Sequence, residues 1–200
     1  MLHVTKIGAL GLAGILSVSV TLNVALVDRV NRLQATMAVA KAKQRRELKV
    51  GDRFTALDGV LMDGTKSRLQ LDDNGKDTIV YVFNTTCKFC DLNLANMRAL
   101  EDQTRGRYRF VGLTLSDKQD LDSYVSTNQF TFPVFRSITD DVKESLGLGA
   151  TPETILISST GTVAGVWKGA FTETIQTALE DRFGVHLPGV TPGVTPGVTR

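Results

Sequence analysis

Short apolar runs, separated by polar turns, fill the chain between residues 49 and 187. Seven of these runs are rich in β-branched and aromatic residues or alternate with polar ones, which is typical of strands. The predicted strands are Phe54–Leu61, Ser67–Leu71, Thr78–Asn84, Arg109–Leu115, Phe132–Phe135, Ile155–Ser158 and Val163–Trp167.

Four other segments have the residue pattern of helices. They are Asp91–Glu101, Lys118–Asn128, Asp140–Leu146 and Thr172–Phe183. Ser116 or Asp117 stands where the second helix needs an N-cap. The turns Met62–Thr65 and Ser159–Thr162 predict β-hairpins. Strands alternating with helices, followed by a hairpin and a last helix, predict a three-layer α/β fold.

An uncharged run of 21 residues, Ile7–Val27, lies near the N-terminus. That length can cross a bilayer, so we expect a transmembrane anchor at 7–27 after a short flank at 1–6. The alternative is a cleaved signal peptide with an apolar centre at Ile7–Leu16 and a cleavage site at Ser17–Ser19. The run continues beyond Ser19, which favours the retained anchor. A buried helix of a soluble protein fits less well, because no polar face is present.

Two further segments flank the predicted domain at 49–187. Residues 28–48 are polar, with a thin line of apolar residues at helical spacing. They predict a juxtamembrane spacer or a short pairing helix, and their length favours the spacer. Residues 188–200 repeat a Pro-Gly-Val-Thr unit, which predicts a flexible tail.

Charge and residue usage argue against several function classes. The net charge is +2, and the basic residues form no stripe interleaved with aromatic ones, so we expect no nucleic-acid partner. Two cysteines are too few for a disulfide scaffold. Both histidines, His3 and His186, are far from the cysteines in sequence, so we expect no metal site within one chain.

The motif Cys87-Lys88-Phe89-Cys90 carries the candidate chemistry. It lies where the predicted strand Thr78–Asn84 turns into a helix. A thiol there faces unpaired backbone N–H groups and the positive end of the helix dipole, and both favour the reactive thiolate. Two cysteines at this spacing can close and reopen a disulfide, which predicts dithiol–disulfide exchange. A purely structural disulfide across so short a loop would contribute little stability.

Two charged neighbours are candidates for tuning the acidity of the thiols. Lys88 lies between the cysteines and favours a thiolate electrostatically, although an exposed lysine would be screened by salt. Asp91 either accepts a proton during exchange or complements the dipole of the helix on whose first turn it lies.

Four features in this order resemble a thioredoxin-fold protein of the membrane-anchored ResA/TlpA-like redoxin family. The first is Val50-Gly51-Asp52, followed by a turn containing Gly64. The second is the strand that ends in the cysteine motif. The third is Leu146–Pro152 leading into Thr154–Ile157, and Gly161-Thr162-Val163 is the fourth. The resemblance covers residues 49–183 and the anchor.

The resemblance implies a central mixed sheet flanked by helices and an extracytoplasmic thiol–disulfide oxidoreductase without a cofactor. Cys87 would attack and Cys90 would resolve. Thr151 and Pro152, joined by a cis peptide bond, would lie beside the cysteines and receive the partner polypeptide. The partners would be protein thiols or disulfides, together with a membrane electron donor. The protein would cross the inner membrane once, with its redox domain in the periplasm.

The charge pattern around the anchor contradicts this orientation. Six basic residues follow the run within 20 positions: Arg29, Arg32, Lys41, Lys43, Arg45 and Arg46. By the positive-inside rule, they place the domain in the cytoplasm. We follow the family resemblance and expect the extracytoplasmic side.

Three positions depart from the family pattern. Thr86 replaces the tryptophan that usually precedes the first cysteine. Tyr81 stands where thioredoxins carry a buried aspartate, and Asn93 stands where ResA-like proteins carry a glutamate. A buried carboxylate near the thiols would exchange protons with them, so the proton path is expected to differ here.

Other function classes remain open. A non-catalytic thioredoxin-like binding module or a Sco-type copper chaperone is the principal alternative. Sco-type sites need a Cys-x-x-x-Cys pair and a downstream histidine, and the pair here is shorter. A peroxiredoxin needs threonine three residues before its cysteine; that position is Asn84 for Cys87, so peroxidase activity is not expected.

Overall fold

The computed structural model describes residues 19–20, 22–34, 47–71, 75–115 and 120–190. The chain forms two compact units, Met1–Arg45 and Arg46–Arg200. In the first unit, residues 22–34 are helical. Within the described residues, no helix combines the length and the apolar character that crossing a membrane requires. Most of the predicted anchor at 7–27, part of the spacer and the end of the tail lie outside them.

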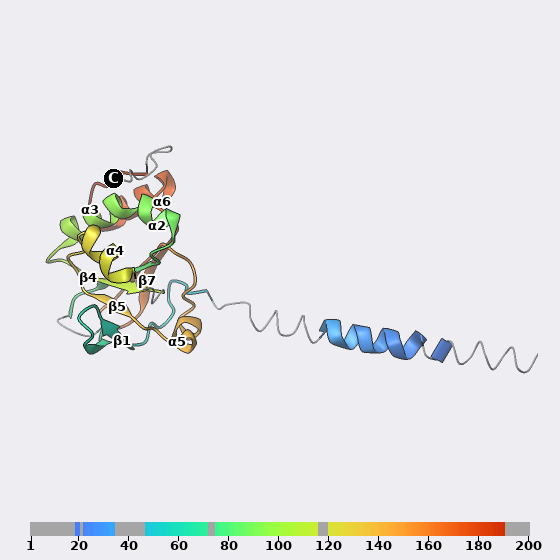
Figure 1. The fold of residues 1–200 in the computed structure, drawn as a ribbon. Coiled ribbons are helices and arrows are strands. Elements are labelled where there is room, and N and C mark those ends of the chain that lie inside the picture. The colour runs from blue at the N-terminus through green and yellow to red at the C-terminus, as the bar shows by residue number, and fades with distance from the viewer. Residues whose placement is uncertain (1–18, 21, 35–46, 72–74, 116–119, 191–200) are drawn as a thin grey trace, which may run out of the picture. The chain divides into compact units, whose positions relative to one another are not determined.

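The second unit is built on one seven-stranded mixed sheet (Figure 1). The strand order is β2-β1-β5-β4-β3-β6-β7. β4 pairs in parallel with β3 and β5, and the remaining pairs are antiparallel. The strands are β1 Leu57–Leu61, β2 Lys66–Leu69, β3 Thr78–Phe83, β4 Arg109–Thr114, β5 Val134–Arg136, β6 Glu153–Ile157 and β7 Val163–Lys168. The predicted α/β fold and both predicted hairpins are confirmed.

Strand β3 is central because both of its faces are buried. Ile79, Tyr81 and Phe83 face one hydrophobic cluster, and Val80 and Val82 face the other. This alternation follows from the two-residue period of a strand.

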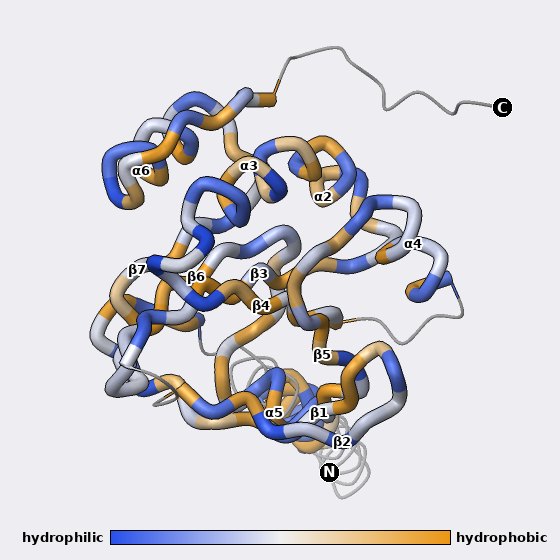
Figure 2. The backbone as a smooth tube through the Cα atoms, turned by 90° about the vertical axis from the view of Figure 1, so that its left-hand side faces the viewer, coloured by the Kyte–Doolittle hydropathy of each residue, from blue (hydrophilic) through white to orange (hydrophobic). Residues whose placement is uncertain are grey.

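Helices cover both faces of the sheet. α2 Lys88–Leu92, α3 Leu94–Thr104 and α6 Glu173–Phe183 lie on the side of Tyr81, whereas α5 Asp140–Ser145 lies on the other side (Figure 2). Apolar side chains of α3 and α6 pack against the first face, among them Met97, Leu100 and Leu179. The cysteine motif follows β3 and begins α2, so it lies at the end of the central strand, on the side of the sheet that Tyr81 faces.

Two of the four predicted helices differ from the structure by more than one residue, whereas α5 and α6 each differ from the predicted bounds by a single residue. The helix predicted at Asp91–Glu101 is two helices, α2 and α3, separated at Asn93, and it begins earlier than predicted. Asn93 caps both helices with φ −95° and ψ −3°. The helix predicted at Lys118–Asn128 is α4 Leu121–Thr127. The predicted caps Ser116 and Asp117 lie outside the described residues.

Candidate active site

Cys87 lies at the turn that joins β3 to α2. It is the N-cap residue of α2, in an extended conformation. The turn is closed by a hydrogen bond of 3.1 Å from the Cys87 N–H to the carbonyl oxygen of Asn84. The Cys87 sulfur accepts a hydrogen bond of 3.3 Å from the backbone N–H of Cys90. Such a donor stabilises negative charge on the sulfur.

The two thiols differ in exposure. Both cysteines are free; Cys87 is half-buried and Cys90 is fully buried. Burial raises the pKa of the Cys90 thiol well above its usual value, and the neighbouring Cys87 raises it further. Cys90 is therefore shielded from solvent, while the attacking and resolving roles of the two cysteines stay predictions.

The Thr151–Pro152 peptide bond is cis, as expected from the family resemblance. The Cys87 thiol donates a hydrogen bond of 3.2 Å to the Thr151 carbonyl oxygen. Pro152 is buried and directly precedes β6, and its carbonyl oxygen accepts a hydrogen bond of 2.8 Å from Gly169 N–H. The structure thus brings Cys87, Cys90, Thr151 and Pro152 together, and substrate binding by the last two stays a prediction.

Comparison with known proteins identifies the family of this chain. The family model described as AhpC/TSA family matches residues 50–166. The chain belongs to the AhpC/TSA family. This membership agrees with the thioredoxin-like oxidoreductase predicted from the cysteine pair. The comparison with curated proteins found no match.

Solved structures similar to this AhpC/TSA chain share its fold. The thioredoxin domain of a thiol-disulfide oxidoreductase from Bacteroides vulgatus has a TM-score of 0.58 at 17% identity, covering 68% of this chain and 99% of its own. StoA from Bacillus subtilis has a TM-score of 0.51 at 16% identity, with 63% and 95% covered. Peroxidoxin BcpB from Mycobacterium tuberculosis has a TM-score of 0.55 at 16% identity, with 68% and 94% covered. They support the expected thioredoxin-like fold with a mixed sheet.

The predicted tuning residues of the AhpC/TSA site have different surroundings. Lys88 is exposed, and it makes no ion pair with any other described residue. Asp91 is half-buried and accepts a hydrogen bond of 2.9 Å from the hydroxyl of Tyr124. This contact assigns Asp91 a structural role in joining α2 to α4. Tuning of the thiols by Lys88 or Asp91 stays a prediction.

A buried polar pair, Tyr81 and Asn93, lies beneath the cysteines. The Asn93 side-chain amide donates to the Tyr81 hydroxyl at 3.4 Å, and its oxygen accepts from Phe171 N–H at 2.9 Å. Burial raises the pKa of Tyr81, and the nearby Cys90 charge adds to this effect, so Tyr81 stays a neutral phenol. Asn93 therefore ties the cysteine helix to the loop after β7. The sequence identified both positions as departures from the family pattern, but it did not reveal their contact.

Glu153 is a second feature of the site that the sequence pattern did not indicate. It follows Pro152 directly and is fully buried, and neither carboxyl oxygen has a hydrogen-bond partner among the described residues. Burial raises its pKa to about 7, although the Lys168 charge opposes this rise; the Glu47 charge adds a smaller increase. Strand alternation places Glu153 on the face of Ile155, opposite to Cys90. The only signal in the sequence was a lone acidic residue at the start of an apolar strand.

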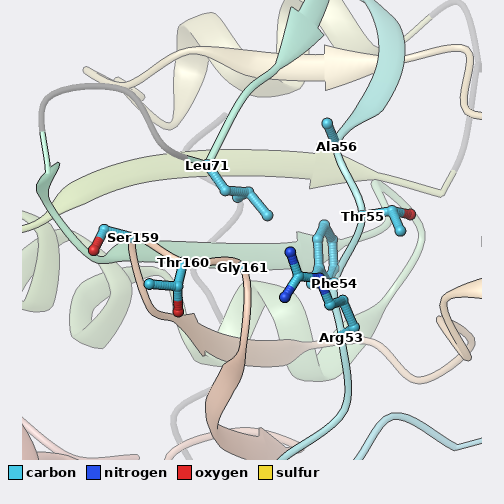
Figure 3. A pocket seen from close by; sticks show the side chains of 8 residues that line it. All are labelled: Arg53, Phe54, Thr55, Ala56, Leu71, Ser159, Thr160 and Gly161. Atoms are coloured by element: carbon cyan, nitrogen blue, oxygen red, sulfur yellow. The ribbon is translucent and has the colours of Figure 1, made fainter.

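One cavity of the AhpC/TSA domain lies away from the cysteines. It has a volume of about 330 Å³ and lies beside the β6–β7 hairpin (Figure 3). Its lining includes Arg53, Phe54 and Thr160. The hairpin follows β6, whereas Pro152 precedes this strand, so the five residues of β6 separate the hairpin from Pro152 by roughly 17 Å.

In the described part of the chain, no cluster of three or more His, Cys, Asp or Glu is arranged to bind a metal ion.

Proposed function

We propose that this protein exchanges electrons with protein thiols and disulfides through the Cys87–Cys90 pair. The observation that carries this proposal is the asymmetry of the pair. Cys87 is half-buried, and its sulfur accepts a hydrogen bond from the backbone N–H of Cys90, whereas Cys90 itself is fully buried. The accessible sulfur can meet a partner, and the buried thiol can release it.

Exchange in the reducing direction has two steps. The Cys87 thiolate attacks one sulfur of a substrate disulfide, so a mixed disulfide forms and the other substrate sulfur leaves as a thiolate. The Cys90 thiol then loses its proton and attacks the Cys87 sulfur, which forms the Cys87–Cys90 disulfide and releases the second substrate thiolate. Two electrons pass to the substrate, and its thiolates take up two protons. The oxidising direction is the reverse.

The Thr151 carbonyl oxygen takes part in the first step. In the resting state it accepts the Cys87 thiol proton in a 3.2 Å hydrogen bond. Loss of that proton frees the oxygen to accept an N–H from an extended partner. The raised pKa of Cys90 keeps this thiol protonated until a mixed disulfide lies beside it.

Substitution of each cysteine tests the assigned roles. In Cys90→Ser, attack remains and release is lost, so disulfide-linked partner complexes accumulate on non-reducing gels. Cys87→Ser gives none. Equal trapping by the two variants would show that the roles are assigned wrongly. A non-catalytic binding module would bind partners without forming disulfide-linked complexes, and a Sco-type chaperone would retain copper in metal analysis.

The location proposed for this activity is the extracytoplasmic side of the inner membrane, as in ResA/TlpA-like redoxins. The uncharged run Ile7–Val27 supports a single membrane anchor. A membrane electron donor would then keep the pair in its working redox state. Protease added to spheroplasts should digest the domain. Digestion only after lysis would instead support the orientation predicted by the positive-inside rule.

A further inference from the structure

Residues 185–189, which follow α6, are bound to the domain by side chains of α3 and α6. Gln103 of α3 makes two hydrogen bonds with the backbone of His186, accepting from its N–H at 2.9 Å and donating to its carbonyl oxygen at 2.7 Å. The N–H of Leu187 donates to Glu180 at 2.6 Å, and the Leu187 side chain is buried. We call residues 185–189 the C-terminal strap.

The strap ends at a position that favours glycine. Gly189 has a φ of 79°, in the left-handed region, and a Cβ there would lie 2.7 Å from Oε1 of Gln176. Its N–H donates a hydrogen bond of 2.7 Å to Oδ1 of Asn96, a fully buried side chain. Asn96 lies in the first turn of α3 and Gln103 in its last turn. The strap therefore runs back along α3 towards the helix that carries the cysteines.

Hydrogen bonds continue from Asn96 to the residues beneath the cysteines. The Asn96 amide donates to Oδ1 of Asn93 at 3.4 Å, and the Asn93 amide donates to the Tyr81 hydroxyl oxygen at 3.4 Å. All three side chains are buried. We call this series, from the Gly189 N–H to the Tyr81 hydroxyl, the amide relay. A backbone N–H can only donate, so Gly189 occupies the Asn96 oxygen and turns the Asn96 NH₂ group towards Asn93. The Phe171 N–H, which also donates to Asn93 Oδ1, fixes the same direction.

This direction makes the Tyr81 hydroxyl hydrogen the end of the relay. The Tyr81 oxygen accepts from Asn93, and the hydroxyl donates to none of the described residues. Asn93 lies one helical turn after Cys90, and its N–H donates to the Cys90 carbonyl oxygen at 3.0 Å. Residues three apart share a helix face, and Tyr81 and Cys90 belong to the same hydrophobic cluster. The Tyr81 hydroxyl is therefore a buried donor next to the buried thiol.

We propose that the C-terminal strap positions Tyr81 for the release step: through the amide relay, it holds the Tyr81 hydroxyl so that it donates a hydrogen bond to the Cys90 thiolate. This inference rests on the proposed thiol–disulfide exchange and deepens its second step. When Cys90 loses its proton, negative charge develops on a buried sulfur, and a positioned hydrogen-bond donor stabilises that charge. Burial raises the pKa of Tyr81, so Tyr81 keeps its own proton and acts as a donor rather than as a base.

Reaction of the reduced, full-length protein with dithiobis(nitrobenzoate), an aryl disulfide, separates the two steps. Cys87 attacks one sulfur of the reagent, which forms a mixed disulfide and releases the first coloured aryl thiolate. Cys90 then loses its proton to the buffer and attacks the Cys87 sulfur, so the Cys87–Cys90 disulfide forms and the second aryl thiolate leaves. At high reagent concentration the first phase is fast, whereas the second is independent of concentration. Stopped-flow absorbance therefore measures the release step by itself.

The amide relay predicts which substitutions slow the second phase. Tyr81→Phe removes the hydroxyl and should slow this phase by about tenfold, the order expected for losing a hydrogen bond to a charged group. Gly189→Ala displaces the strap from Asn96 and should slow it by about threefold, the order expected for losing one neutral hydrogen bond. The double variant should be no slower than Tyr81→Phe, because both substitutions act through the same donor.

Gln103→Ala is the matched control. It removes the two hydrogen bonds to His186 at the other end of the strap and leaves Gly189 in contact with Asn96. Its second phase should keep the wild-type rate, although urea unfolds the variant more easily. The positioning role is overturned if Gly189→Ala or Tyr81→Phe keeps the wild-type second phase, if Gln103→Ala slows it as much as Gly189→Ala, or if the double variant is slower than Tyr81→Phe. A wild type that releases only one aryl thiolate per molecule would overturn the proposed function itself.

Discussion

Glu153→Gln tests whether one buried carboxyl group makes the stability of this protein depend on pH. Glutamine has the shape of a protonated glutamate but cannot ionise. In the folded protein Glu153 is fully buried, and its carboxyl oxygens have no hydrogen-bond partner among the described residues. Neither solvent nor a hydrogen-bond donor among these residues stabilises the charged carboxylate, so ionisation of Glu153 raises the free energy of the folded state.

The size of the effect follows from the pKa of Glu153, which is about 7 in the folded protein against an ordinary 4.5. Between these two pH values the folded state holds a proton that the unfolded state has lost. The free energy of unfolding therefore falls as pH rises, by about 1.4 kcal/mol per pH unit. The loss amounts to about 3 kcal/mol and is complete above about pH 7. It is absent below pH 4.5, where both states are protonated.

Urea unfolding of the reduced, full-length protein between pH 4 and pH 8.5 measures this difference directly. Wild type and Glu153→Gln should be similar at the acid end, and the variant should be more stable by up to about 3 kcal/mol at the alkaline end. Glu144→Gln, at an exposed position of α5, is the matched control and should follow the wild type. A difference between Glu153→Gln and wild type that is constant with pH would refute the reasoning.

Three other substitutions test further contacts, each by urea unfolding. Lys168→Met removes the charge that lowers the pKa of Glu153, so the pH-dependent loss of stability should extend above pH 7; an unchanged profile would contradict this. Gly112→Ala places a Cβ 2.9 Å from the Phe132 ring and 3.0 Å from Val134, and it should cost about 1–3 kcal/mol; an unchanged midpoint would show that the core adapts freely. Asn93→Ala leaves Phe171 N–H without its acceptor and should cost about 1–3 kcal/mol, whereas a neutral result would mean that water replaces the amide.

The strands were predictable because local patterns determine them. β3 is β-branched and aromatic throughout, and the β6–β7 hairpin has a glycine turn between two apolar runs. The break at Asn93 was not predictable, because the residues on both sides of it favour a helix. It coincides with contacts to Tyr81 and Phe171, which are distant in sequence.

The site was predictable only in part. The cysteine motif and its place after a strand can be read locally. The contact of Cys87 with Thr151 spans 64 residues and was expected only from the family resemblance. The burial of Glu153 depends on pairing with β3 and β7 on either side. Likewise, the partner of Asp91 is Tyr124, on a different helix.

The central claim is that Cys87 and Cys90 form one redox couple. Its most direct test is to equilibrate the full-length protein in glutathione buffers of increasing oxidised fraction, quench with acid, alkylate, and analyse the motif peptide by mass spectrometry. We predict that both cysteines lose reactivity together, as a single two-electron transition to an intramolecular disulfide. The claim is contradicted if Cys90 stays alkylatable in every buffer while Cys87 alone acquires glutathione.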